Sequence, residues 1–143
     1  MKKTQYIVVV GCGRLGSMLA SRLSGQGHSV VVIDPQESAF KALSAEFSGF
    51  QIIGDAAELA TLHAAKADKA DCLLAVTDQD NLNLMVAQIA KRLFTVPQVL
   101  ARVFDPARES IYRELEIATI SPTQLSADAF LQTLSQSFEQ VST

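Results

Sequence analysis

The stretch at residues 6–16, YIVVVGCGRLG, decides the fold that the sequence predicts. Five residues with strong β preference lead into three glycines with the spacing G-x-G-x-x-G, and an amphipathic pattern begins at Leu15. Such a stretch is typical of a buried strand that turns directly into a helix. Gly11 permits the tight turn, Gly13 lets a pyrophosphate approach the backbone, and Gly16 lets the helix pack against its strand. The free amides and the positive dipole end of that helix favour a phosphate.

An acidic residue at the end of the next apolar run supports a nucleotide site. Residues 30–33 are Val-Val-Val-Ile, and Asp34 follows them, 18 residues after Gly16. A carboxylate at the tip of the second strand can accept hydrogen bonds from a ribose diol. Because its charge repels a 2′-phosphate, the sequence favours NAD, ATP or ADP over NADP. The alternative for Asp34 is a plain helix cap.

Strands and helices alternate along the rest of the chain. Helices are predicted from residue 15 to the glycines at 25 and 27, at 36–47, briefly around Leu59 and Leu62, at 80–94 and at 106–115. Strands are predicted at 30–33, 51–53, 71–76, 98–103 and 117–120. This alternation indicates an α/β protein with a Rossmann-type, doubly wound parallel sheet of six strands in the order 3-2-1-4-5-6.

The last segment carries a helix that no strand follows. Ser121 and Pro122 cap a predicted helix that reaches about Val141. Its apolar residues recur at three- and four-residue spacing: Ala127, Phe130, Leu131, Leu134, Phe138 and Val141. This stripe either folds back onto the sheet or meets another subunit, and we favour the second because earlier helices already cover the sheet. We therefore expect a nucleotide-binding domain at residues 1–122 and a helix at 123–143 that crosses to a partner subunit.

The composition bounds the classes of function. The chain has 143 residues, 48% of them hydrophobic, and a net charge of −3, with Lys2-Lys3 as its basic cluster, so nucleic-acid binding is not expected. No apolar run approaches the roughly 18 residues that span a bilayer, and the N-terminus carries no apolar signal segment. The sequence predicts a cytoplasmic protein that meets a membrane only through a partner.

The cysteines and histidines do not form a reactive site in the sequence. Cys12 and Cys72 form no C-x-x-C pair and have no histidine at ligand spacing, so neither a metal site nor a disulfide is expected. His28 and His63 lie far apart and have no triad context.

The candidate ligand-binding residues stand at the carboxyl ends of the predicted strands, where such sheets bind ligands. Asp55 ends the third strand, where an adenine edge would lie. Alternatively, its carboxylate only closes the turn and caps the following helix. Thr77 and Asp78 end the fourth strand beside the phosphates, and either can cap the next helix. Arg14, inside the glycine loop, can close on phosphate oxygens or remain solvated. Arg102, near the end of the fifth strand, can reach the same phosphates or an interface.

Side chains for hydride transfer are missing from the sequence pattern. A nicotinamide enzyme needs a proton donor, commonly a Tyr-Lys or His-acid pair. Tyr6 starts the first strand, and Tyr112 is followed four residues later by Glu116 rather than lysine. The sequence therefore predicts a binding module without catalytic residues. A small NAD-dependent oxidoreductase, or a redox sensor that responds to NADH, is the alternative.

Five stretches together resemble the RCK N-terminal domain, also called the TrkA-N domain: IVVVGCGRLG at 7–16, VVVID at 30–34, GDA at 54–56, LLAVTDQDNLNL at 73–84 and VLARVFDP at 99–106. The resemblance covers the chain to Pro122. It implies a cytosolic domain, beneath a potassium channel or transporter, that forms dimers and often octameric rings. It also implies that NAD(H), ATP or ADP binds there and gates the pore.

The resemblance also assigns roles to residues of the matching motifs. The implied nucleotide contacts are Gly11, Gly13, Arg14, Leu15 and Gly16 for the phosphates, Asp34 for the ribose, Asp55 and Ala56 for the adenine side, Thr77 and Asp78 for the far end, and Arg102 near the phosphates and the dimer contact. Cys12 and Pro35, beside these residues, are also expected to bind the nucleotide. Family members usually continue into a second, smaller ligand-binding domain. They also tend to have a glycine before the sixth strand, whereas residues 115–117 here are Leu-Glu-Ile.

Overall fold

A six-stranded parallel sheet forms the centre of the protein. The computed structural model describes residues 3–141, and its strand order is β3-β2-β1-β4-β5-β6, so the predicted order is confirmed. Every neighbouring pair of strands is parallel. The strands are β1 Tyr6–Val10, β2 Ser29–Asp34, β3 Phe50–Ile53, β4 Cys72–Ala75, β5 Gln98–Arg102 and β6 Ala118–Ile120.

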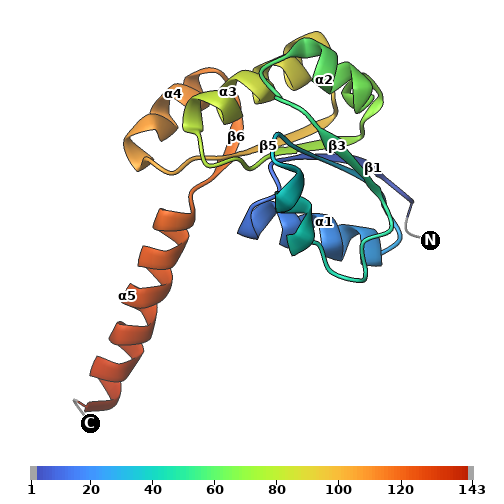
Figure 1. The fold of residues 1–143 in the computed structure, drawn as a ribbon. Coiled ribbons are helices and arrows are strands. Elements are labelled where there is room, and N and C mark those ends of the chain that lie inside the picture. The colour runs from blue at the N-terminus through green and yellow to red at the C-terminus, as the bar shows by residue number, and fades with distance from the viewer. Residues whose placement is uncertain (1–2, 142–143) are drawn as a thin grey trace.

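Helices cover both faces of this sheet (Figure 1). One face carries α1 Arg14–Gly25 and the 3₁₀ helix η1 Glu37–Ala42, and the other carries α2 Leu59–Ala64, α3 Asp80–Gln88 and α4 Glu109–Glu114, with the short segments η2 Ala67–Lys69, η3 Ile89–Leu93 and η4 Pro106–Arg108. Successive residues of β1 enter opposite cores: Val8 packs with the cluster of Leu62 and Val86, and Val9 with that of Ala20 and Phe40. Burial on both faces explains why these strands are continuous apolar runs.

The helix predicted at residues 36–47 is wrong. Only η1 forms there, and the backbone becomes extended at Leu43. Two serines of α1 provide other partners for the following amides. The N–H of Ser44 donates to Ser21 Oγ (3.0 Å), and the N–H of Ser48 donates to Ser24 Oγ (2.9 Å). Because α1 satisfies these amides from outside, the chain after η1 lies against α1 and does not continue as an α-helix.

The corner before β6 takes a left-handed turn without glycine. Glu116 adopts a φ of 59°, in a region that costs a non-glycine residue about 1–2 kcal/mol. Lys91 Nζ donates to the carbonyl of Glu116, and Arg92 Nη2 donates to that of Leu115 (2.8 Å). Two basic side chains from η3 therefore hold the corner.

The C-terminal helix α5, Pro122–Val141, forms as predicted and projects away from the sheet (Figure 1). The hydroxyl of Ser121 accepts the N–H of Gln124 (3.1 Å), so Ser121 caps the helix. No residue of α5 is buried, and Phe130, Phe138 and Val141 are 69, 66 and 83% exposed. The apolar stripe does not fold back onto the sheet of its own chain.

The side chain of Asn83 joins the ends of β4 and β5. It is completely buried. Its Oδ1 accepts the N–H (2.9 Å) and the hydroxyl (2.6 Å) of Thr77, and its Nδ2 donates to the carbonyls of Thr77 (3.1 Å) and Arg102 (3.0 Å). One amide therefore fixes the two loops against each other.

Replacing Asn83 should destabilise the protein strongly. Asn83→Leu keeps a similar volume but leaves the amide of Thr77 and the carbonyl of Arg102 without this partner, so we expect a loss of about 2–4 kcal/mol in the free energy of unfolding. Urea denaturation measures this loss. The exposed Asn81 on the same helix is the control, and Asn81→Leu should change stability by less than about 1 kcal/mol. Equal losses in both variants would contradict the role of Asn83.

Candidate functional site

A cavity of about 410 Å³ lies at the carboxyl ends of the central strands. It is the place where the strand order reverses between β1 and β4, where open parallel sheets bind ligands. Nine of the thirteen predicted ligand-binding residues line it: Gly11, Gly13, Asp34, Pro35, Asp55, Ala56, Thr77, Asp78 and Arg102. The fold thus brings together residues that are up to 91 positions apart in the chain.

The glycine loop brings bare backbone to this cavity. Gly11 has a φ of 106°, and a Cβ on Gly16 would lie 1.8 Å from the carbonyl oxygen of Gly11, so α1 packs directly on the turn. A Cβ on Gly13 would meet nothing within 4 Å. Gly13 is therefore the position where space stays open in front of the backbone. The first turn of α1 directs its free amides and its positive dipole end toward that space.

The carboxylate of Asp34 accepts hydrogen bonds from two backbone amides and can accept more. Its Oδ2 accepts the N–H of Cys12 (2.9 Å), and its Oδ1 accepts the N–H of Gln36 (2.9 Å). A carboxylate has about four acceptor positions, so each oxygen can accept one further hydrogen bond. The two amide contacts hold the carboxylate at the tip of β2 beside the glycine loop.

Arg102 forms the wall of the cavity at the end of β5. Its Nη2 and Nε donate to the carbonyl oxygen of Thr77, at 2.7 and 3.3 Å. Burial lowers the pKa of the guanidinium, and the nearby carboxylates of Asp78 and Asp80 act in the opposite direction. An arginine stays charged at neutral pH under such shifts, so this wall is positive.

The other two carboxylates of the cavity differ in their contacts. Asp55 Oδ1 accepts the N–H of Ala57 (2.9 Å) and closes the turn before α2. Asp78 is exposed after β4. Neither Thr77 nor Asp78 caps α3, contrary to one expectation, because its N-cap is Gln79, without a side-chain cap hydrogen bond.

Four predicted residues lie outside the cavity lining. Gly16 is buried under the turn, and Leu15 packs in the core on the α1 face. Burial, with Asp34 as a smaller cause, raises the pKa of the Cys12 thiol to about 11, so it is protonated at neutral pH. Arg14 is exposed and, with Cys12, lines a separate groove between α1 and η1.

The sequence pattern missed several residues of this site. Gln36, Gln79 and Leu82 line the cavity, and Asn83 supports it from behind. The signal for Asn83 was present, since it lies three residues before Val86, on the buried side of a helix where a polar residue needs partners. Gln36 follows β2 outside the quoted stretches, and Gln79 lies within the stretch at 73–84 but was assigned no role there.

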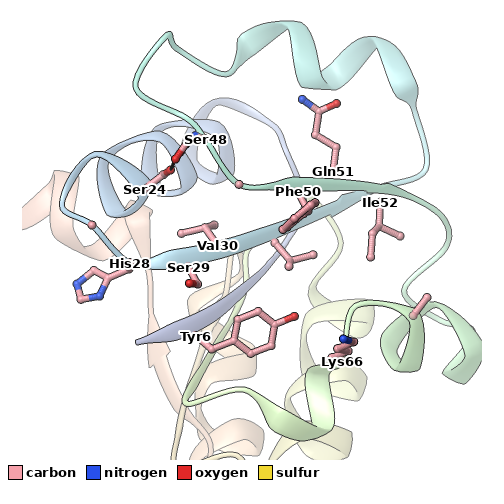
Figure 2. A pocket seen from close by; sticks show the side chains of 14 residues that line it. Tyr6, Ser24, His28, Ser29, Val30, Ser48, Phe50, Gln51, Ile52 and Lys66 are labelled. Carbon is pink, nitrogen blue, oxygen red and sulfur yellow. Dashed lines mark hydrogen bonds between the residues drawn. The ribbon is translucent and has the colours of Figure 1, made fainter. Parts of the chain in front are cut away.

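A second, larger cavity of about 720 Å³ lies at the opposite edge of the sheet, at the amino ends of β1, β2 and β3. Figure 2 shows Tyr6, Ser29, Phe50 and Lys66 around it. No aspartate or glutamate is among its lining residues, and α1 and α2 end at this edge rather than begin there. It offers no carboxylate that could accept hydrogen bonds from a ribose diol, so we place the candidate site at the carboxyl ends.

Within residues 3–141, no helix is long and apolar enough to cross a membrane. In the same part of the chain, no cluster of three or more His, Cys, Asp or Glu side chains could hold a metal ion.

Solved structures support the fold. The RCK domain of GsuK has a TM-score of 0.80 and 21% identity, and the match covers 95% of this chain and 29% of that chain. The TrkA-N domain of the inner membrane protein YbaL from Escherichia coli has a TM-score of 0.80 and 19% identity, and the match covers 94% of this chain and 99% of that chain. Three neighbours carry nucleotides. GsuK bound to NAD has a TM-score of 0.67 and 20% identity, and the match covers 85% of this chain and 22% of that one. GsuK bound to ADP has a TM-score of 0.70 and 17% identity, covering 87% of this chain and 33% of that one. The Kef C-terminal domain of Shewanella denitrificans in its AMP-bound form has a TM-score of 0.73 and 24% identity, covering 92% of this chain and 80% of that one.

Sequence comparison identifies the family. The Trk system potassium uptake protein TrkA of Streptomyces coelicolor is 39% identical over 129 residues, which cover 90% of this chain and 58% of that protein. A TrkA homolog of Pyrococcus abyssi is 30% identical over 135 residues, 90% of this chain and 60% of that protein. The chain thus spans about three-fifths of these relatives. The model of the TrkA-N domain matches residues 7–122, and the chain belongs to the TrkA-N domain family.

Proposed function

We propose that this domain binds an adenine nucleotide without a 2′-phosphate in the carboxyl-end cavity and thereby regulates a potassium channel or transporter. The observation that carries this proposal is the pairing of Asp34, with its unused acceptor capacity, and the open backbone at Gly13 within one cavity. A ribose diol and a phosphate need these two features side by side.

The contacts suggest how a nucleotide lies. The adenine is proposed to rest beside Asp55 and Ala56, and its ribose donates to Asp34. The phosphates then lie over the glycine loop, where α1 begins. Thr77, Asp78 and Arg102 face the far end of the ligand, as the cavity lining allows. This order follows the strands from β3 to β5.

The charges of the lining bear on which nucleotide is bound. Asp34, Asp55 and Asp78 face a single guanidinium, that of Arg102. This balance disfavours the extra phosphate of NADP at the ribose. NAD(H), ATP and ADP remain as ligands, and structural neighbours of this chain carry NAD, ADP and AMP.

Regulation is proposed to act through assembly. The exposed stripe on α5 is suited to pack on a second copy of the chain, as a homodimer or within a ring, because a 20-residue helix with an uncovered apolar side needs a partner. The assembly is proposed to lie in the cytoplasm, at the inner face of the membrane, bound to a potassium channel or transporter. The names of the curated relatives support this partner.

The alternative is an NAD-dependent oxidoreductase or an NADH redox sensor. The cavity lining contains no histidine, tyrosine or lysine, the side chains that most often donate a proton beside a nicotinamide. This lining supports a binding role over an enzymatic one. A redox sensor would bind NADH and NAD with different affinities and ignore ADP.

Calorimetric titration with ADP, NAD, NADH and NADPH tests the proposed ligand. We expect binding of ADP or NAD, and much weaker binding of NADPH. Asp34→Asn should weaken the binding of ADP or NAD about tenfold or more, because the variant loses charge-assisted hydrogen bonds to the ribose. Gly13→Ala should also weaken binding while leaving stability nearly unchanged, since its Cβ meets only open space in the free protein.

Glu114→Gln is the matched control, because it removes one exposed carboxylate outside the cavity. Its affinity should equal that of the wild type. Binding that is indifferent to Asp34 and Gly13 would contradict the proposed site.

Light scattering after size exclusion tests the assembly. The wild type should be a dimer or larger, and Leu134→Glu should shift it toward the monomer by placing a charge in the centre of the stripe. Gln132→Glu, on the opposite side of α5, should leave the mass unchanged. A monomeric wild type, or equal effects of both substitutions, would contradict association through the stripe.

A further inference from the structure

An exposed aromatic ring lies directly against the cationic wall of the cavity. The guanidinium carbon of Arg102 lies 4.3 Å from the centroid of the Phe104 ring, within the range of a cation–π contact. Phe104 is 40% exposed and follows β5 without contributing to either core cluster. Burial therefore does not explain a large aromatic residue at this position.

The backbone of Phe104 is held in place independently of its ring. Its N–H donates to Asp80 Oδ1 (2.7 Å), and the next amide, of Asp105, donates to Asp80 Oδ2 (3.1 Å). Asp80 is the first residue of α3, whose residue Asn83 also binds the carbonyl of Arg102. The ring and the guanidinium are thus presented by backbones that α3 holds together.

Two nitrogens of the Arg102 guanidinium are held by Thr77, and the third is available to donate to a ligand. Nε and Nη2 both donate to Thr77, while Nη1 donates to no acceptor among the described residues. Arg102 already lines the cavity in this orientation. It can donate Nη1–H to a ligand oxygen without leaving Thr77 or the ring. An arginine that is fixed before binding loses less side-chain entropy when the ligand arrives.

We propose that Phe104 is a positioning residue, which holds the guanidinium of Arg102 in the orientation that receives the phosphates of the bound nucleotide. This role rests on the proposed function, because it requires a nucleotide whose phosphates reach Arg102. Phe104 touches Arg102 and does not line the cavity. It therefore affects the phosphates only through the arginine.

Titrations with ADP and with adenosine, which has no phosphate, test this role. Phe104→Leu should weaken ADP binding about two- to fivefold, the worth of one partly exposed cation–π contact, and leave adenosine binding unchanged. Phe104→Tyr keeps an aromatic face and should retain the ADP affinity of the wild type. A merely structural role would affect both ligands alike.

A double-mutant cycle makes the test specific to Arg102. Arg102→Gln should weaken ADP binding more than adenosine binding, and adding Phe104→Leu should cause no further loss. An unchanged or higher ADP affinity in Phe104→Leu, an equal loss for adenosine, or a further loss in the double variant would overturn the role of Phe104. A wild type that binds none of ADP, adenosine, NAD and ATP would instead overturn the proposed function, and this role with it.

Discussion

The buried amide of Asn83 holds the loops after β4 and β5 together, and one wall of the candidate cavity depends on it. It binds the backbone of Thr77 through both of its polar atoms and the carbonyl of Arg102 through one. The Arg102 side chain then donates back to Thr77. A polar group of this kind is costly to bury unless every partner is present, so it specifies one arrangement of the two loops. The cationic wall is therefore rigid before any ligand arrives.

Local patterns predicted the parts of the structure that depend on short-range physics. The glycine spacing identified the turn into α1, and apolar runs identified all six strands and their order. The helix at 36–47 failed because distant groups bind the end of the segment: Ser21 accepts the amide of Ser44, and Ser24 accepts the amide of Ser48 just beyond it. Asn83 was missed as a part of the site because its role depends on contacts distant in sequence. Its helical spacing marks it as buried, but its partners Thr77 and Arg102 lie at the ends of two different strands, which periodicity does not encode.

A domain with one rigid wall can regulate only if the rest of the assembly has two arrangements that bind the nucleotide with different affinity. The structure offers a separation of tasks that suits this requirement. The sheet and its loops form the cavity, and α5 extends from the end of β6 with its apolar stripe uncovered. Coupling of about 1–3 kcal/mol between such sites is typical of allosteric proteins.

The most direct test of the proposed site is a map of backbone amide shifts by ¹⁵N–¹H NMR during a titration with ADP. We expect the largest shifts at Gly11, Cys12 and Gly13 and at the ends of β2, β3 and β4. Gly27, Gly49 and Lys66, around the amino-end cavity, should remain unchanged. Shifts confined to those three residues and their neighbours would place the nucleotide at the wrong edge of the sheet and contradict the account.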